Sequence, residues 1–349
     1  MRSLLTLLCY LAVCQPCLHA SLAYESVYAF SELKSVSFEK LVRGEIIGTR
    51  TSLEGSELSL GAEFFYVVRL PPDLVLQKMK ALNSPDGEES KTASASTCHP
   101  IRIPAELQDF AGLTLDPGSK GTGRFLRQLY KNVSSGTGLN LSNPEKEKLA
   151  SVLNQNPASN AGRTQAGRAA EALRELLNQR AKNFQTSGLM GCAPYENSGQ
   201  RFEHGQETLR ALRCRPRVLQ AFSEILDPVM AGRQPADAPA PHFYWEMSDV
   251  QKEQTIGLGA FFSQPFDTGQ RAAEVTYYVS SQYYLSLTLY QLIPVEIEGK
   301  PGTYVYRADF VLTPSVTRIK GIERIAAENI LLVEIRKSVQ SFVDRCNGM

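Results

Sequence analysis

The feature that most constrains the fold is a change of hydrophobic period near the end of the chain. Between 283 and 293 the apolar and polar side chains alternate, with Tyr283, Leu285, Leu287, Leu289 and Ile293 on one side and Tyr284, Ser286, Thr288 and Tyr290 on the other. This two-residue period predicts a strand. From about 320 to 345 the period becomes helical, with one apolar face made of Ile325, Leu332, Ile335, Val339 and Phe342. Burying that face contributes on the order of 10 kcal/mol gross, so we expect the helix to lie on strands.

The same patterns predict the rest of the architecture. Strands are expected at 44–53, 58–69, 255–263, 272–279 and 303–312, the first two forming a hairpin. Pro71-Pro72-Asp73 begins a helix that runs to Leu82. In the long segment between this helix and the strand at 255–263, helical patterns occupy 105–113, 123–133, 143–154, 163–184 and 216–230. The expected fold class is α+β: a curved antiparallel sheet from 24–82 and 242–349 grips the C-terminal helix, and 83–241 is a mainly helical insertion.

The N-terminal segment predicts export. Arg2 precedes an apolar run from Leu4 to Val13, which is shorter than the ~20 residues that a membrane-spanning helix needs. A basic start, a short apolar run and small residues at a cleavage site after Ala20 or Ala23 are typical of a signal peptide, here 1–23. A core helix and a lipoprotein signal at the nearby cysteines are the alternatives. We expect a soluble protein in the periplasm or outside the cell, with no transmembrane segment.

Four cysteines follow the expected signal peptide: Cys98, Cys192, Cys214 and Cys346. In an exported protein an even number permits two disulfides, and the sequence leaves the three possible pairings open. Four free thiols are the alternative. The spacings do not fit a zinc site of paired CxxC type.

Charge and motifs exclude several classes of function. The chain has 37 Lys and Arg against 36 Asp and Glu, which argues against a nucleic-acid-binding protein. It contains no HExxH, GxSxG or P-loop sequence. We therefore predict no cofactor and no metal, and no catalytic residue can be assigned; whether the protein is an enzyme stays uncertain.

One segment carries an excess of positive charge. Residues 161–217 hold ten Arg and Lys and five Glu. This surface could receive an acidic partner. A solvated helix face is the alternative.

Tyrosines are concentrated in the C-terminal strands, where they serve either ordinary packing or the lining of a cavity. Gln291 interrupts an apolar strand face, and Arg336 lies near the apolar face of the final helix. The predicted ligand contacts are Tyr277, Leu287, Gln291, Tyr306 and Arg336.

Two resemblances follow from these segments. A strand leading into Pro71-Pro72-Asp73-Leu74-Val75, a later run of antiparallel strands and a long final helix resemble the START/Bet v1-like helix-grip fold, over about 44–82 and 242–345. This resemblance implies a sheet wrapped round the C-terminal helix, with an apolar molecule often held between them. The 83–241 insertion is large for that fold.

The chain is also similar to a family of uncharacterised exported bacterial proteins. The segments that carry this likeness are 41–45, 107–117, 243–245 and 283–287, including Leu113-Thr114-Leu115-Asp116-Pro117. In that family two closely spaced cysteines usually follow the Leu-Thr-Leu-Asp-Pro motif, whereas the corresponding region 127–138 has none here. Any role of that pair is absent or altered in this chain.

These observations leave three functions open. The first is binding or carrying an apolar molecule, with a lipid as the leading candidate, between the sheet and the last helix. The second is an enzyme on the same scaffold, which a carboxylate beside His204 or His242 would favour. The third is a partner-binding protein that acts through the basic 161–217 region.

Overall fold

The computed structural model describes residues 24–348 except 54, 83–96, 117, 119, 136–137, 155–164, 198, 251–252, 268 and 315–321. The predicted signal peptide, 1–23, lies outside the described residues.

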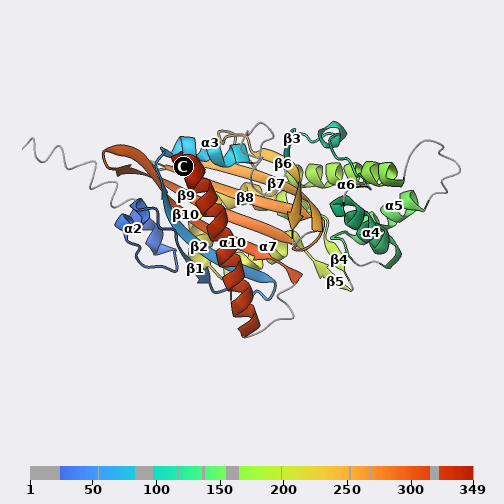
Figure 1. Cartoon of the computed structure of the whole chain (residues 1–349), viewed down its shortest axis with the longest axis horizontal. Helices are drawn as coiled ribbons and strands as arrows, with labels where there is room; N and C mark the ends of the chain where they lie inside the picture. Colours follow the sequence, from blue (N-terminus) through green and yellow to red (C-terminus); the bar gives the residue numbers. More distant parts are fainter. Residues whose placement is uncertain are drawn as a thin grey trace, which may run out of the picture.

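One eight-stranded antiparallel sheet organises the molecule (Figure 1). Its spatial order is β1-β2-β10-β9-β8-β7-β6-β3. The strands are β1 (Ile47–Thr51), β2 (Ser59–Val68), β3 (Thr97–Ile101), β6 (His242–Val250), β7 (Glu253–Phe266), β8 (Gly269–Val279), β9 (Leu285–Ile297) and β10 (Lys300–Leu312). The predicted hairpin of β1 and β2 is confirmed, and β2 pairs with β10, so segments from both ends of the chain share the sheet.

The turn between β9 and β10 shows how the sequence sets the register of the two strands. Ile297 pairs with Lys300, which leaves Glu298 and Gly299 as the two loop residues. Both have positive φ, 52° and 78°. A two-residue hairpin of this hand needs positive φ at both positions, and glycine adopts it without strain.

Two helices cover one face of the sheet. They are α3 (Pro72–Leu82) and α10 (Ile322–Asn347). Ile335, Val339 and Phe342 are buried against this face as predicted, but Ile325 is 46% exposed. The first turns of α10 extend past the β1 edge of the sheet (Figure 1), so the apolar face of the helix is buried only in its C-terminal half.

A helical layer covers the opposite face. Its helices are α4 (Lys120–Ser135), α5 (Asn143–Leu153), α6 (Gln165–Ser187), α7 (His204–Arg213), α8 (Pro216–Ala221) and α9 (Ser223–Ala231). Short elements complete it: η1 (Ser26–Ala29), α2 (Phe38–Val42), η3 (Leu107–Phe110), η5 (Gly188–Gly191), β4 (Tyr195–Asn197) and β5 (Gln200–Phe202). The predicted helix over 216–230 is divided at Phe222, which separates α8 from α9.

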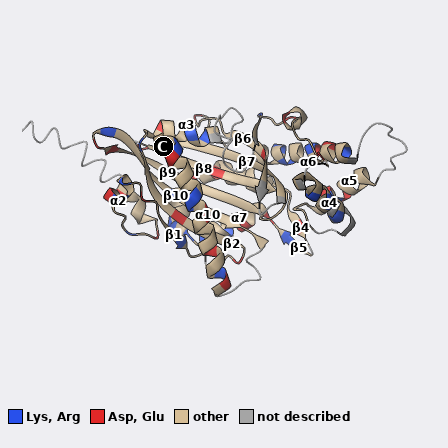
Figure 2. Ribbon diagram, viewed as in Figure 1, with Lys and Arg blue, Asp and Glu red and all other residues tan. Residues whose placement is uncertain are grey.

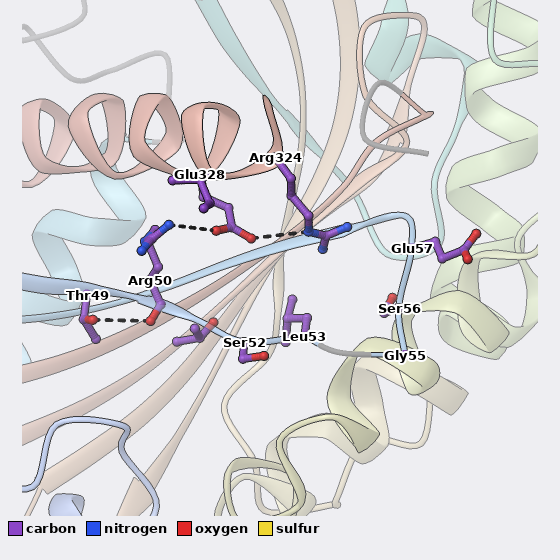
Figure 3. A pocket seen from close by; sticks show the side chains of 11 residues that line it. Thr49, Arg50, Ser52, Leu53, Gly55, Ser56, Glu57, Arg324 and Glu328 are labelled. Carbon is purple, nitrogen blue, oxygen red and sulfur yellow. Dashed lines mark hydrogen bonds and ion pairs between the residues drawn. The ribbon is translucent and has the colours of Figure 1, made fainter. Parts of the chain in front are cut away.

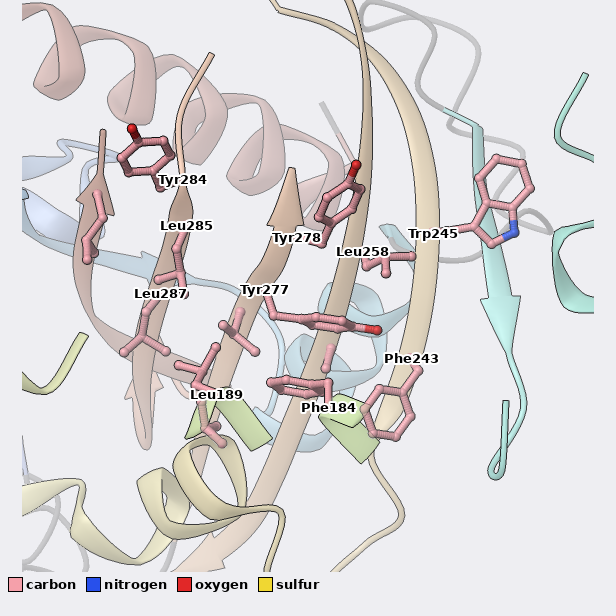
Figure 4. Packing of buried hydrophobic residues seen from close by; sticks show 14 of the residues in the cluster. Phe184, Leu189, Phe243, Trp245, Leu258, Tyr277, Tyr278, Tyr284, Leu285 and Leu287 are labelled. Atoms are coloured by element: carbon pink, nitrogen blue, oxygen red, sulfur yellow. The ribbon is translucent and has the colours of Figure 1, made fainter. Parts of the chain in front are cut away.

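The larger core lies between this helical layer and the sheet (Figure 4). At its centre Tyr277 stacks on Phe184, with ring centroids 3.9 Å apart and the planes nearly parallel. Phe243 meets Phe184 edge-on. Offset and edge-on aromatic pairs add to the free energy of area burial, so this cluster fixes the helical layer on the sheet.

Three sequence predictions need correction. β6 and β3 were not predicted, and β3 lies inside the predicted insertion yet forms an edge of the sheet by pairing with β6. β9 begins at Leu285, so Tyr283 and Tyr284 do not continue its alternation, and Tyr284 packs in the core with Leu285. No disulfide joins Cys98, Cys192, Cys214 or Cys346.

Candidate functional site

The structure separates the five predicted ligand contacts. Tyr277, Leu287 and Tyr306 belong to the core under the helical layer. Gln291 has the same parity as Leu287 in β9 and pairs with Tyr306, so it faces that layer too. Arg336 is exposed on α10. These residues therefore do not enclose one space between the sheet and the final helix.

A different set of side chains does meet beneath α10. There a cavity of about 210 Å³ is lined by Tyr66, Met79, Glu274, Tyr290, Arg307, Ser338, Phe342 and Arg345. They come from β2, α3, β8, β9, β10 and the C-terminal half of α10. The cavity thus lies in the predicted sheet–helix space, but its lining is rich in charged and hydroxyl groups.

Two tyrosines hold the carboxylate of Glu274. Tyr244 donates to Oε1 at 3.0 Å and Tyr290 donates to Oε2 at 3.4 Å. Tyr244 stands on β6 and Glu274 on β8, so the tyrosine ring crosses β7 at Gly259. A Cβ on Gly259 would lie 2.2 Å from Cζ of Tyr244, which shows why glycine is required there.

Arg307 and Asp309 form the second polar element of the site. They stand two residues apart on β10, hence on the same face of the sheet. Arg307 donates from Nε to both carboxylate oxygens, at 3.0 and 2.8 Å, and from Nη2 to Oδ1 at 2.8 Å. Thr288 also donates to Oδ1 at 2.9 Å. Asp309 thereby fixes the guanidinium plane of Arg307.

The pKa shifts show which groups keep their protons. Burial on its own would lower the pKa of Arg307, but Asp309 and Tyr290 outweigh it and the pKa is raised. Burial also raises the pKa of the hydroxyls of Tyr66, Tyr244 and Tyr290. At neutral pH these groups are therefore a cation and three protonated hydroxyls, which suits the binding of a polar molecule more than proton abstraction.

The larger hollows elsewhere are open grooves. Figure 3 shows one of about 620 Å³ between β1, the β1–β2 turn and the start of α10. Three of its four charged side chains are already paired, since Glu328 contacts Arg50 at 3.3 Å and Arg324 at 3.4 Å, and the fourth is Glu57. A polar ligand there would have to displace these contacts.

A second groove, of about 420 Å³, is mainly apolar. Phe184, Phe243 and Phe262 form part of its wall, and residues 234–236 together with Ala238, Ala240 and Pro241 form the other side. Tyr277 lies behind Phe184, and its buried hydroxyl has no hydrogen-bond partner among the described residues.

A third groove, of about 590 Å³, is bordered by Phe202, Tyr284 and Arg210. His204 lies behind it, 1% exposed and packed edge-on against Tyr195 and Phe202. Neither ring nitrogen of His204 has a hydrogen-bond partner in the part of the chain that the structure describes. His204 therefore does not form the histidine–carboxylate pair that would favour an enzyme.

Several arginines of the 161–217 region form ion pairs within the molecule, and Figure 2 shows basic and acidic residues together on the helical layer. Arg180 pairs with Glu145, Arg210 with Glu207, and Arg201 with Glu196 and Glu203. Arg174 donates to the carbonyl oxygens of Ala111 and Leu113. These contacts reduce the charge that this surface can offer an acidic partner.

Three further results bear on function. Among the described residues, no three or more His, Cys, Asp or Glu are grouped as metal ligands would be. No helix in the described part of the chain has the length and hydropathy to cross a membrane.

No family model, curated protein or solved structure matches this chain. The candidate site is therefore argued from the arrangement of its own residues and not from a related protein.

Sequence reasoning did not select Tyr66, Glu274, Arg307, Ser338 or Arg345. A signal was nevertheless present, because Glu274, Arg307 and Asp309 are charged residues inside otherwise apolar strands. Buried charges need partners, so such residues at strand centres indicate a polar site.

Proposed function

We propose that this protein binds a small polar molecule in the cavity between the sheet and the C-terminal half of α10. The observation that carries the proposal is the convergence of Glu274, Arg307, Arg345 and the hydroxyls of Tyr66 and Ser338 on one space of about 210 Å³. The antiparallel sheet and terminal helix also support the helix-grip resemblance, which we keep as part of the proposal.

The size and lining of the cavity favour a compact ligand over a lipid. Pockets for drug-sized molecules measure ~300–1,000 Å³ and are mainly apolar. Here about 210 Å³ is bordered by two arginines and a glutamate. An apolar chain would offer no acceptor to Arg345, whose buried Nε has no partner among the described residues, at a cost of roughly 1–3 kcal/mol.

We also propose that the protein is exported, on the basis of the signal-peptide pattern in 1–23. The ligand would then be met outside the cytoplasm. Fractionation of the source cells tests this, and recovery of the full-length chain in the cytoplasm alone would contradict it.

Native mass spectrometry of protein purified from its source tests ligand binding. We expect a retained small molecule in the wild type and its loss in Ser338→Phe, because Ser338 is an exposed residue of the lining and the new ring would obstruct the cavity opening. Ser341→Phe is the matched control, since Ser341 is exposed on the same helix and does not line the cavity. Equal retention in the two variants would refute the site.

A second candidate function is the predicted binding of an apolar molecule, now in the groove at Phe184, Phe243 and Phe262. Its volume of about 420 Å³ and its apolar wall favour it. Binding of a fluorescent fatty acid should weaken in Ala238→Trp, which narrows the groove, and persist in Asp237→Trp, whose side chain is outside the lining. Absence of any fatty-acid binding by the wild type would rule this function out.

A further inference from the structure

The cavity beneath α10 contains more hydrogen-bond donors than acceptors. Nη1 of Arg307 and Nε of Arg345 make no hydrogen bond to a described residue, and the latter is buried. The hydroxyls of Tyr66 and Ser338 also make none within the described part of the chain. Four donor groups thus face one space without an acceptor from the protein.

The acceptors near the cavity are already engaged. Both oxygens of Glu274 receive tyrosine hydroxyls, and Asp309 receives Arg307 and Thr288. Asp309 offsets the charge of Arg307, while no carboxylate forms an ion pair with Arg345 among the described residues. Glu274 places one negative charge in the lining, but neither it nor another described carboxylate pairs with Arg345, whose positive charge has no partner among the described residues.

We propose that the ligand of this cavity carries a compact oxyanion, a carboxylate or a phosphate group, held between Arg307 and Arg345. The inference rests on the proposed function and names the chemical class of its ligand. An oxyanion supplies several acceptors and one or two negative charges in a small volume, and guanidinium groups match its planar or tetrahedral oxygens. The hydroxyls of Tyr66 and Ser338 would complete the contacts.

A purely structural role for Arg345 makes a different prediction. The residue lies in the last turn of α10, where a positive charge stabilises the helix dipole. Its loss would then change basal stability by the same amount with or without anions. The decisive quantity is therefore the anion-dependent part of the stability.

Thermal unfolding of the full chain in inorganic phosphate or acetate, against chloride at equal ionic strength, measures that part. We expect at least one of the two anions to raise the melting temperature of the wild type. In Arg345→Gln the concentration needed for half of this effect should rise roughly tenfold or more. Arg336→Gln, an exposed arginine of the same helix, should behave as the wild type.

The outcomes separate this inference from the proposed function. Ser338→Phe should abolish the anion effect, and an effect that survives it would place the anion elsewhere and overturn the inference. A retained molecule could be lost in Ser338→Phe although neither phosphate nor acetate raises the melting temperature of the wild type. That result would support binding in the cavity and refute the oxyanion as its ligand. The mass of a retained molecule distinguishes inorganic phosphate from an organic acid or phosphoester.

Discussion

At the scale of single residues, Glu63 joins three parts of the chain. Its side chain is 0% exposed and accepts hydrogen bonds from Tyr306 at 2.8 Å, from Ser31 at 2.9 Å and from Arg215. These partners come from β10, the segment after η1 and the turn between α7 and α8. One carboxylate thereby ties the helical layer and the N-terminal segment to the sheet.

We predict that Glu63→Gln lowers the free energy of unfolding by about 3 kcal/mol, since the buried Arg215 loses its buried partner and keeps only the partly exposed Glu32. Denaturant titration measures this. Arg201→Gln is the control, because that arginine is largely exposed and its surface pairs contribute ~1 kcal/mol or less. Equal decreases in the free energy of unfolding for the two variants would contradict this prediction.

A second residue-scale prediction concerns His204. Burial, with Arg180 adding to it, holds the pKa of His204 well below its ordinary value. The unfolded chain binds a proton at this histidine below pH ~6.5 while the folded protein does not, so stability is lost as the pH falls below ~6.5. His204→Phe should remove up to about 1.4 kcal/mol per pH unit from the acid-side slope of stability. Identical slopes in urea titrations at pH 5 and 6.5 would contradict this.

At the scale of elements, β7 carries two glycines with different surroundings on the same face. A Cβ at Gly259 would collide with the ring of Tyr244 at 2.2 Å, whereas at Gly257 the nearest atoms are Cγ and Oε1 of Glu246 at 3.5 Å, an ordinary contact. We predict that Gly259→Ala costs about 1–3 kcal/mol of stability through overpacking and displaces Tyr244 from Glu274. Gly257→Ala should be nearly neutral. Equal urea midpoints of unfolding for the two variants would contradict the prediction that Gly259 is the more sensitive position.

Elements with a strong period were predictable, and those without it were not. The helical stripe at 335–342 buries one face, and the alternation in 285–293 separates two faces that pack in different cores, which is what periodicity reports. β3 is an edge strand of five residues containing Pro100, so its short pattern gives no period. β6 contains Phe243-Tyr244-Trp245, which is aromatic on both faces because both are buried.

The candidate site depended on a further fact that periodicity does not contain. The pattern separates Leu287 from Tyr290, but it does not say which face of β9 meets α10 and which meets the helical layer. Predicting Leu287 and Gln291 as ligand contacts beneath the final helix requires their face of β9 to meet α10, whereas this face lies under the helical layer. The tyrosine- and charge-bearing face, which includes Tyr290 and Arg307, is the one beneath the terminal helix.

At the scale of the whole molecule, the sheet is a central layer with helices on both faces (Figure 1). The two covers differ in extent. Many apolar side chains fix the helical layer to the sheet, while α10 is held by Ile335, Val339, Phe342, Val343 and Cys346 in its C-terminal half. The cavity lies under this half of α10, between the helix and the sheet.

This asymmetry predicts two levels of local stability within one helix. Ile322, Ile330 and Val333 are exposed, so little burial protects the first turns, whereas Val339 and Val343 are fully packed. Hydrogen exchange should be at least about tenfold faster at 323–333 than at 336–346, because local opening of the first turns breaks few apolar contacts. Uniform protection along α10 would mean that the helix opens as one unit. If an oxyanion binds beneath the C-terminal half, phosphate or acetate should slow exchange at 336–346 and leave 323–333 unchanged, since only the former residues close the cavity.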